Sequence, residues 1–128
     1  MKVLILDDSR TDAYLASQIA KVFFDSVRVV GTPQDFYRAL AAETPDLILM
    51  DIHIGDLHNG VAEIDSVRRQ RTPASIVPMF VVTASTDQKL HALAMECGAT
   101  AVLAKPLSAD ALEPLLRQHL CGAYRARR

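Results

Sequence analysis

The sequence is short of the features that mark several large classes of protein. Its 128 residues include only two cysteines, Cys97 and Cys121, without CxxC spacing, so we expect free thiols rather than a disulfide framework. The formal net charge of -1 predicts no general attraction to nucleic acid or to anionic membrane. The first apolar run, residues 3–6, is too short for a signal peptide or a membrane span. We therefore expect a cytoplasmic protein.

Other residues that often mark binding sites are interpreted here as structural or solvated. His53 and His58 share one loop, and loop histidines are usually solvated, so we infer no transition-metal site. The arginines within residues 122–128 predict a basic, solvated tail. Six aromatic residues have spacings typical of a core and predict no stacking platform: Tyr14, Phe23, Phe24, Phe36, Tyr37 and Phe80.

The composition that is present indicates one globular domain. Hydrophobic residues make up 50% of the chain and charged residues 23%, which is typical of a folded protein rather than a disordered one. A chain of this length can bury most of its surface around a single core. We predict one domain over residues 1–128, folded to about residue 121.

Five short apolar runs alternate with longer segments of helical period. This alternation is typical of βαβ units, which form a parallel sheet with helices on both faces. Strands are predicted over residues 2–7, 27–31, 46–51, 77–83 and 100–104. The first, third and fourth runs are continuously apolar and predict central strands, whereas the second alternates and predicts an edge.

Helix boundaries and buried helix faces are also readable from the sequence. Three N-terminal caps are predicted, at Ser9 with Asp12, Thr32 with Asp35, and Ser108 with Asp110, and Gly98 is expected to end the fourth helix. Apolar spacing predicts three buried faces: Leu15, Ile19, Val22 and Phe23; then Leu90, Leu93, Ala94 and Cys97; then Leu112, Leu115 and Leu116.

Residues suited to phosphate and metal chemistry follow four of the predicted strands: Asp7, Asp8, Asp51, Thr83 and Lys105. Open α/β sheets bind ligands at the carboxyl ends of their strands, so these side chains can meet in one cleft. Carboxylates about 4 Å apart repel by roughly 4 kcal/mol at an effective dielectric near 20, so a cation must be present or a proton must be taken up. Lys105 supplies one positive charge, and Mg²⁺ suits a set of short anionic oxygen ligands.

Such a cleft could form an aspartyl phosphate. Lys105 and Mg²⁺ would keep Asp51 ionised, as a nucleophile must be. The lysine, the metal and the Thr83 hydroxyl would then stabilise charge on the transferred phosphoryl group. The sequence therefore predicts phosphoryl chemistry at Asp51.

The chain resembles the response-regulator receiver domains of two-component signalling over essentially its whole length. The resemblance rests on five motifs in order: Asp7-Asp8, Asp51, Gly60 opening the next helix, Thr83-Ala84, and Lys105-Pro106. It implies a doubly wound (βα)5 fold with a five-stranded parallel sheet of order 2-1-3-4-5, as in the chemotaxis member of the family. It also implies a cis Lys105-Pro106 bond and a partner surface on the fourth helix, fifth strand and fifth helix.

The resemblance further implies the roles of the site residues. Asp51 would take a phosphoryl group from a sensor histidine kinase or a histidine phosphotransfer protein, and Thr83 and Lys105 would hold it. Asp8 and Asp51 would bind Mg²⁺ directly, Asp7 through water, and His53 through its backbone carbonyl. The downstream protein target, the phosphoryl lifetime and the formation of a homodimer stay open.

The sequence departs from the common family pattern around this cleft. Val102 stands where many members have an aromatic switch, so the signal would be carried by backbone shifts or by another side chain. Residues 52–59 form a long loop in which Gly55 replaces a common proline. His53 and Ser85 lie two positions beyond Asp51 and Thr83, and we hypothesise that they tune the lifetime of the phosphorylated state.

Three functions compete. We expect a stand-alone receiver that acts as a protein-binding switch or a phosphorelay carrier, with no enzymatic activity beyond its own phosphorylation and dephosphorylation. One alternative is an adaptor whose contacts do not depend on phosphorylation. Another is an aspartate-nucleophile phosphatase of the haloacid dehalogenase type, which needs an acid two residues after its nucleophile. Ser9 follows Asp7 and His53 follows Asp51 at that spacing, which disfavours the phosphatase.

Overall fold

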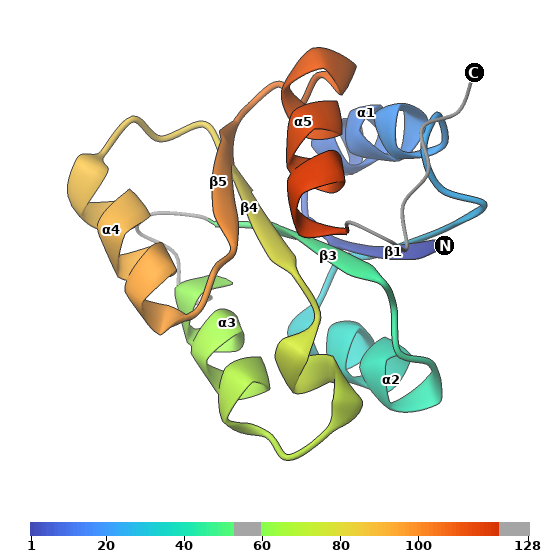
Figure 1. Cartoon of the computed structure of the whole chain (residues 1–128), viewed down its shortest axis with the longest axis vertical. Helices are drawn as coiled ribbons and strands as arrows, with labels where there is room; N and C mark the ends of the chain where they lie inside the picture. The colour runs from blue at the N-terminus through green and yellow to red at the C-terminus, as the bar shows by residue number, and fades with distance from the viewer. Residues whose placement is uncertain (53–59, 121–128) are drawn as a thin grey trace.

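Strands and helices alternate along the chain, as the sequence predicts (Figure 1). The computed structural model describes residues 1–52 and 60–120. The elements are β1 (Lys2–Leu6), α1 (Arg10–Ala20), β2 (Ser26–Val30), α2 (Pro33–Ala42), β3 (Leu47–Asp51), α3 (Gly60–Arg69), η1 (Pro73–Ile76), β4 (Met79–Thr83), α4 (Gln88–Cys97), β5 (Ala101–Ala104) and α5 (Ala109–His119). The strands match the predicted ranges to within two residues, and the short 3-10 helix η1 was not predicted.

The strands form one parallel sheet in the order β2-β1-β3-β4-β5, which confirms the predicted fold class. The three continuously apolar strands β1, β3 and β4 occupy the interior, and β2 lies at an edge, as expected. The register sets Leu6 opposite Met50, and Thr83 opposite Ala104. The carboxyl ends of β1, β3, β4 and β5 therefore lie along the same edge of the sheet.

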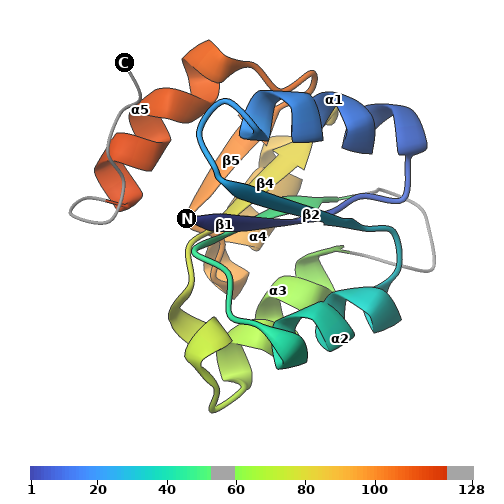
Figure 2. The same cartoon turned by 90° about the vertical axis from the view of Figure 1, so that its right-hand side faces the viewer.

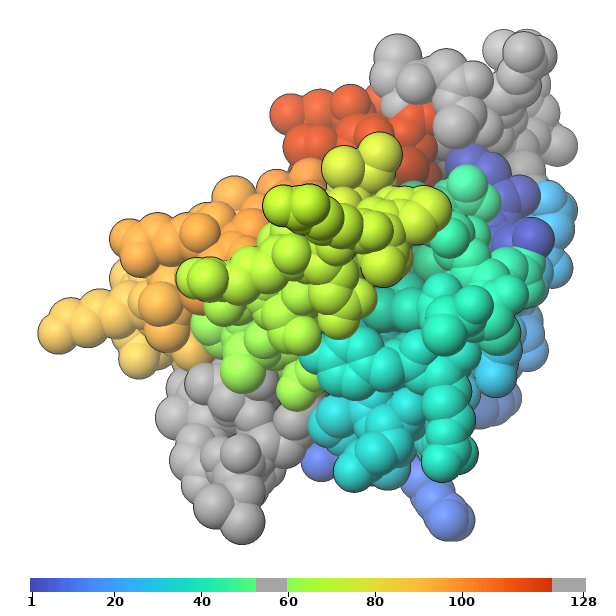
Figure 3. All heavy atoms as spheres, turned by 90° about the horizontal axis from the view of Figure 1, so that it is seen from below, coloured from blue at the N-terminus to red at the C-terminus, as the bar shows by residue number. Residues whose placement is uncertain are grey.

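Helices cover both faces of the sheet. Figure 2 shows α1 and α5 on one side and α2 and α3 on the other. Seen from below, α3 lies between α2 and α4 (Figure 3). This arrangement buries the central strands on both faces and leaves their carboxyl ends open for a site.

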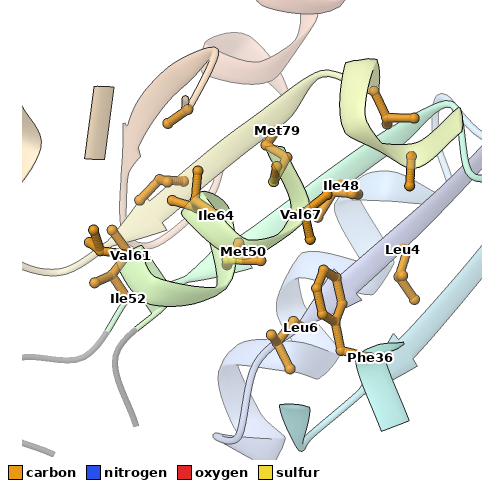
Figure 4. Close-up of a cluster of buried hydrophobic side chains, with 14 of the residues drawn as sticks. Leu4, Leu6, Phe36, Ile48, Met50, Ile52, Val61, Ile64, Val67 and Met79 are labelled. Atoms are coloured by element: carbon orange, nitrogen blue, oxygen red, sulfur yellow. The ribbon is translucent and has the colours of Figure 1, made fainter. Parts of the chain in front are cut away.

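Two hydrophobic clusters fill the two layers. Alternate strand residues enter opposite clusters, so that Leu4 and Leu6 pack toward α2 and α3, while Val3 and Ile5 pack toward α1 and α5. Figure 4 shows the first cluster, in which Phe36 is completely buried beside the strand residues. Burial of each such large side chain contributes about 1.5–3 kcal/mol, so these two clusters hold the strand ends in place.

The predicted helix caps are present. Ser9 Oγ accepts a hydrogen bond from the Asp12 N–H at 3.3 Å, and Thr32 Oγ1 accepts from the Asp35 N–H at 3.1 Å. Ser108 also caps its helix, but its hydroxyl accepts from the N–H of Ala111 rather than engaging Asp110. Helix α4 ends at Gly98, whose φ of 118° lies in the left-handed region that favours glycine.

The predicted buried face of the first helix is half right: Phe23 is buried and Ile19 packs against the same cluster, but the other two residues are exposed. Leu15 and Val22 are 46% and 52% exposed, and Tyr14, which was expected in the core, is 62% exposed. The buried residues of the helix are instead small: Ala13, Ala16, Ser17 and Ala20. Small side chains let a helix backbone lie close to a sheet. The helix therefore buries the face that carries its small residues rather than the face that carries its larger ones. In α4, Leu93 is also exposed, whereas Ala94 is completely buried.

Arg68 connects α3 to segments on either side of it. Its guanidinium donates hydrogen bonds to the backbone carbonyls of Ser75 at 2.9 Å, Val77 at 2.6 Å and Gly98 at 2.9 Å. Burial lowers the pKa of Arg68 below its ordinary value. The sequence offered no signal for this residue, because its acceptors are backbone atoms that only the folded chain brings together.

The structure describes one of the two cysteines. Cys97 is a free thiol, as predicted, and Cys121 lies outside the described residues, as does the predicted basic tail. Among residues 1–52 and 60–120, no helix combines the length and the apolar character that crossing a membrane requires.

Candidate functional site

Three carboxylates meet at the carboxyl edge of the sheet. Asp7 follows β1 directly, Asp8 comes next, and Asp51 is the last residue of β3. One oxygen from each of the three lies within 4.8 Å of the others. Asp7 and Asp51 are buried, whereas Asp8 is exposed. The sequence therefore placed these three acids correctly, and their spacing suits a small cation with oxygen ligands.

The side chain of Lys105 lies within this acidic cluster. Its Nζ is 2.7 Å from Asp51 Oδ1 and 3.3 Å from Asp7 Oδ2. The backbone supports the placement, because the Lys105 N–H donates to the Thr83 carbonyl at 2.9 Å and the Lys105–Pro106 peptide bond is cis, as expected. Only 13% of the lysine side chain is exposed, so its charge is directed at the carboxylates rather than into bulk water.

Burial and the neighbouring groups shift the pKa values of Asp7 and Lys105. Burial raises the pKa of Asp7 above its ordinary value, although the hydrogen bond from the Ser9 N–H at 2.9 Å acts in the opposite direction. Burial acts to lower the pKa of Lys105, but hydrogen bonds to Asp51 and Asp12 outweigh it and raise that pKa above its ordinary value. The lysine is therefore charged throughout the neutral range.

Asp12 belongs to this cluster, although the sequence interpretation treated it only as part of a helix cap. Its Oδ2 lies 2.9 Å from Lys105 Nζ. Asp12 lines an open cleft together with Asp51, Thr83, Ser85 and Lys105. A signal existed in the sequence, since Asp12 lies in the first helical turn after Asp7-Asp8, but its side chain could equally have faced solvent.

Thr83 lies at the end of β4 and is almost completely buried. Its Oγ1 accepts a hydrogen bond from the Ser85 N–H at 3.1 Å. The Ser85 carbonyl in turn lies 2.8 Å from Nε2 of His91, on α4. A chain of two hydrogen bonds therefore leads from the cleft to α4, and sequence analysis did not anticipate the part played by His91.

Gly60 begins α3 directly against the backbone of Asp51. A Cβ at this position would lie only 2.6 Å from the Asp51 carbonyl oxygen. Glycine is therefore required here for close approach, which agrees with its place in the motif.

One predicted group of residues cannot be placed. His53, proposed as a metal ligand through its carbonyl and as a tuning residue, lies outside the described residues together with Gly55 and His58. Ser85, the second proposed tuning residue, lines the cleft beside Asp51 and Thr83. Among the described residues the metal-ligand set is Asp7, Asp8 and Asp51, whose hard anionic oxygens fit Mg²⁺.

Several known proteins are similar to this chain. It is 35% identical over 109 residues to a protein-glutamate methylesterase/protein-glutamine glutaminase of Halobacterium salinarum, covering 82% of the chain and 30% of that relative. It is 27% identical over 104 residues to the regulatory protein VirG of Agrobacterium fabrum, covering 81% of the chain and 40% of VirG. The chain thus spans less than half the length of either relative.

A solved structure and a family model are also similar to this chain. The receiver domain of a signal transduction histidine kinase from Syntrophus aciditrophicus superposes with a TM-score of 0.80 at 25% identity, covering 98% of this chain and 94% of that one. The family model for the response regulator receiver domain matches residues 3–117. The chain therefore belongs to the response regulator receiver domains, which accept a phosphoryl group in two-component signalling.

Proposed function

We propose that this receiver domain accepts a phosphoryl group on Asp51 from a phosphohistidine donor, a sensor histidine kinase or a histidine phosphotransfer protein. The phosphorylated domain then signals by changing its protein contacts or by passing the group onward. The observation that carries the proposal is the 2.7 Å contact between Lys105 Nζ and Asp51 Oδ1 at the end of a central strand. A buried carboxylate held by a lysine beside two further acids is suited to nucleophilic attack on phosphorus.

The reaction on this site is an in-line displacement. A carboxylate oxygen of Asp51 attacks the phosphorus, the bond from phosphorus to the donor nitrogen breaks, and its electron pair leaves with the imidazole. Lys105 stabilises negative charge on the phosphoryl oxygens, and the Thr83 hydroxyl, whose oxygen accepts from Ser85, donates its proton to one of them. Asp7, Asp8 and Asp51 would hold Mg²⁺, which when bound neutralises charge on the phosphoryl oxygens.

The hydrogen bond between Ser85 and Thr83 suggests how the signal leaves the site although Val102 stands in place of an aromatic residue. If the Thr83 side chain shifts as its hydroxyl donates to the phosphoryl group, Oγ1 moves relative to the Ser85 N–H, and Ser85 is also the residue whose carbonyl lies against His91. His91 lines a surface hollow with Met95, Val102 and Leu115, from α4, β5 and α5. We therefore assign the output to this α4-β5-α5 face, with Ser85 and His91 as its link to the cleft.

The competing functions make different predictions. An adaptor that ignores phosphorylation would bind its partner equally well with and without a phosphoryl mimic on Asp51. A phosphatase of the haloacid dehalogenase type would turn over small phosphate esters many times. We propose neither, because no acid follows Asp51 two residues later, as the phosphatase needs, and because the cluster of Asp7, Asp51 and Lys105 is suited to taking up a phosphoryl group.

Phosphoryl transfer can be tested directly by mass. The protein is incubated with Mg²⁺ and acetyl phosphate, and intact mass is measured for the wild type, Asp51→Ala and Asp46→Ala. Asp46 is the control because its carboxylate accepts from the Lys2 N–H at the opposite end of the sheet. We expect one added phosphoryl group on the wild type and Asp46→Ala, and none on Asp51→Ala. A phosphoryl group retained by Asp51→Ala would reject the proposed acceptor.

The output route needs a separate experiment. Hydrogen exchange is followed in residues 84–95 with and without acetyl phosphate, for the wild type and for His91→Ala. We expect phosphorylation to increase exchange in the wild type, and His91→Ala to exchange faster before phosphorylation, with a smaller further change. If both proteins respond equally, His91 does not link the cleft to α4.

A further inference from the structure

We propose that Asp12 is a positioning residue that holds Lys105 while Asp51 is unphosphorylated and competes with the incoming phosphoryl group for its ammonium. This inference rests on the proposed function of Asp51. It adds a role for a residue in the first turn of α1, whose carboxylate lies 2.9 Å from Lys105 Nζ.

Among the described residues, the Lys105 ammonium has three neighbouring carboxylates, as many as it has protons. A lysine ammonium can donate three hydrogen bonds. Its Nζ lies 2.7 Å from Asp51 Oδ1, 2.9 Å from Asp12 Oδ2 and 3.3 Å from Asp7 Oδ2. A phosphoryl oxygen that accepts a hydrogen bond from Lys105 must therefore displace one of these carboxylates.

Burial decides which carboxylate is displaced. The side chains of Asp7 and Asp51 are only 6% and 4% exposed, so little water reaches their oxygens to take the place of the lysine. The Asp12 side chain is 41% exposed, so water can replace the lysine at its oxygens. Asp12 is therefore the group that releases Lys105 when the phosphoryl group arrives.

The release does not require α1 to unfold. The backbone of Asp12 is held independently of its carboxylate, because its N–H donates to the Ser9 hydroxyl at 3.3 Å. The carboxylate can turn toward solvent while the cap stays in place. Asp12 thus acts on the reaction through Lys105 and is not itself part of the phosphoryl-binding set.

The first test removes the charge of Asp12 and keeps its shape. At saturating Mg²⁺ we expect Asp12→Asn to take up a phosphoryl group from acetyl phosphate about two- to fivefold faster than the wild type, since a half-exposed ion pair contributes modestly. Asp12→Glu should restore the wild-type rate, because its carboxylate can still reach Lys105. The rate is measured by the intact mass of samples quenched over time.

A matched variant controls for the loss of an acid from a helix start. Asp35 occupies the same place in α2, with its N–H donating to the Thr32 cap, but its carboxylate pairs with Arg38 at 3.5 Å. Asp35→Asn should therefore leave the phosphorylation rate unchanged. Thermal unfolding of both variants separates any shared structural effect from the effect on the reaction.

A double-mutant cycle with Lys105 separates a contact from general electrostatics. In a Lys105→Gln background, Asp12→Asn should no longer raise the rate, because the residue through which it acts is gone. The proposal is overturned by equal rates for Asp12→Asn and the wild type, by an increase that persists without Lys105, or by an Asp12→Glu variant as fast as Asp12→Asn. Failure of the wild type to take up any phosphoryl group would instead reject the proposed function.

Discussion

The close approach of Gly60 to Asp51 makes Gly60→Ala a sensitive test of how the site is built. An alanine Cβ would lie 2.6 Å from the Asp51 carbonyl oxygen, about 0.8 Å short of the 3.4 Å at which ordinary contact begins. The neighbouring atom belongs to the backbone of a central strand, so no side chain can turn aside. Either the first turn of α3 or the end of β3 must move.

The size of the effect follows from that displacement. Overpacking of this kind costs about 1–3 kcal/mol in the free energy of unfolding. A shift of roughly 1 Å at a reacting group can lower a rate by about 100-fold. Because part of the strain can be taken up by α3, we expect Gly60→Ala to slow phosphorylation of Asp51 by about tenfold.

Gly31→Ala is the matched control, since it is the same substitution near the same edge of the sheet. Its Cβ would lie 3.8 Å from the Asp7 carbonyl oxygen, which is ordinary contact. We expect Gly31→Ala to be neutral or stabilised by up to about 1 kcal/mol. Urea unfolding followed by circular dichroism measures both free energies, and intact mass measures both rates. If the two variants are equally stable and equally reactive, the close approach of Gly60 does not constrain the site.

Three further substitutions test the fold around the site. Burial and the hydrogen bond to Glu63 raise the pKa of Tyr37 to about 12, so the folded protein keeps a proton that the unfolded chain loses near pH 10. Stability should therefore fall as pH rises from about 10 to 12, and Tyr37→Phe should show a shallower fall in urea midpoints; equal slopes would contradict this. Arg68→Met should cost about 2–4 kcal/mol, because three backbone carbonyls lose a charged donor, and unchanged urea unfolding would contradict this. Phe36→Ala should cost about 3–5 kcal/mol in the same assay, since its side chain is completely buried, and a cost below 1 kcal/mol would mean that the cluster refills the cavity.

Much of the site was predictable because strand ends are encoded locally. A run such as Leu47–Met50 is apolar on both faces only when it is central, and the polar residue that follows it must then lie at the sheet edge. Asp7, Asp51, Thr83 and Lys105 were placed together by this reasoning, with the strand order taken from the family. Thr83 lines the cleft with Asp51, and its hydroxyl also accepts a hydrogen bond from the Ser85 N–H, which the sequence did not predict.

Helix orientation was less predictable, because apolar spacing does not say how closely a helix approaches its sheet. Leu15 and Val22 satisfied a helical period, yet the sheet is covered by Ala16 and Ala20, which belong to the same cluster as Val3. The sequence is compatible with burial of either face of the helix, the one with small residues or the neighbouring one with large residues. Only packing against the strands decides between them.

Local patterns in the chain specify the alternation of strands and helices, the central strands, and the charged residues at their carboxyl ends, because periods of two and 3.6 residues depend only on neighbouring residues. The tertiary structure decided how those charges are shared. Lys105 and Asp12 lie 93 positions apart in the sequence, and their contact depends on how α1 packs against the sheet and where β5 lies within it. The same holds for Arg68 and for His91, whose partners are backbone carbonyls that no residue type specifies in advance.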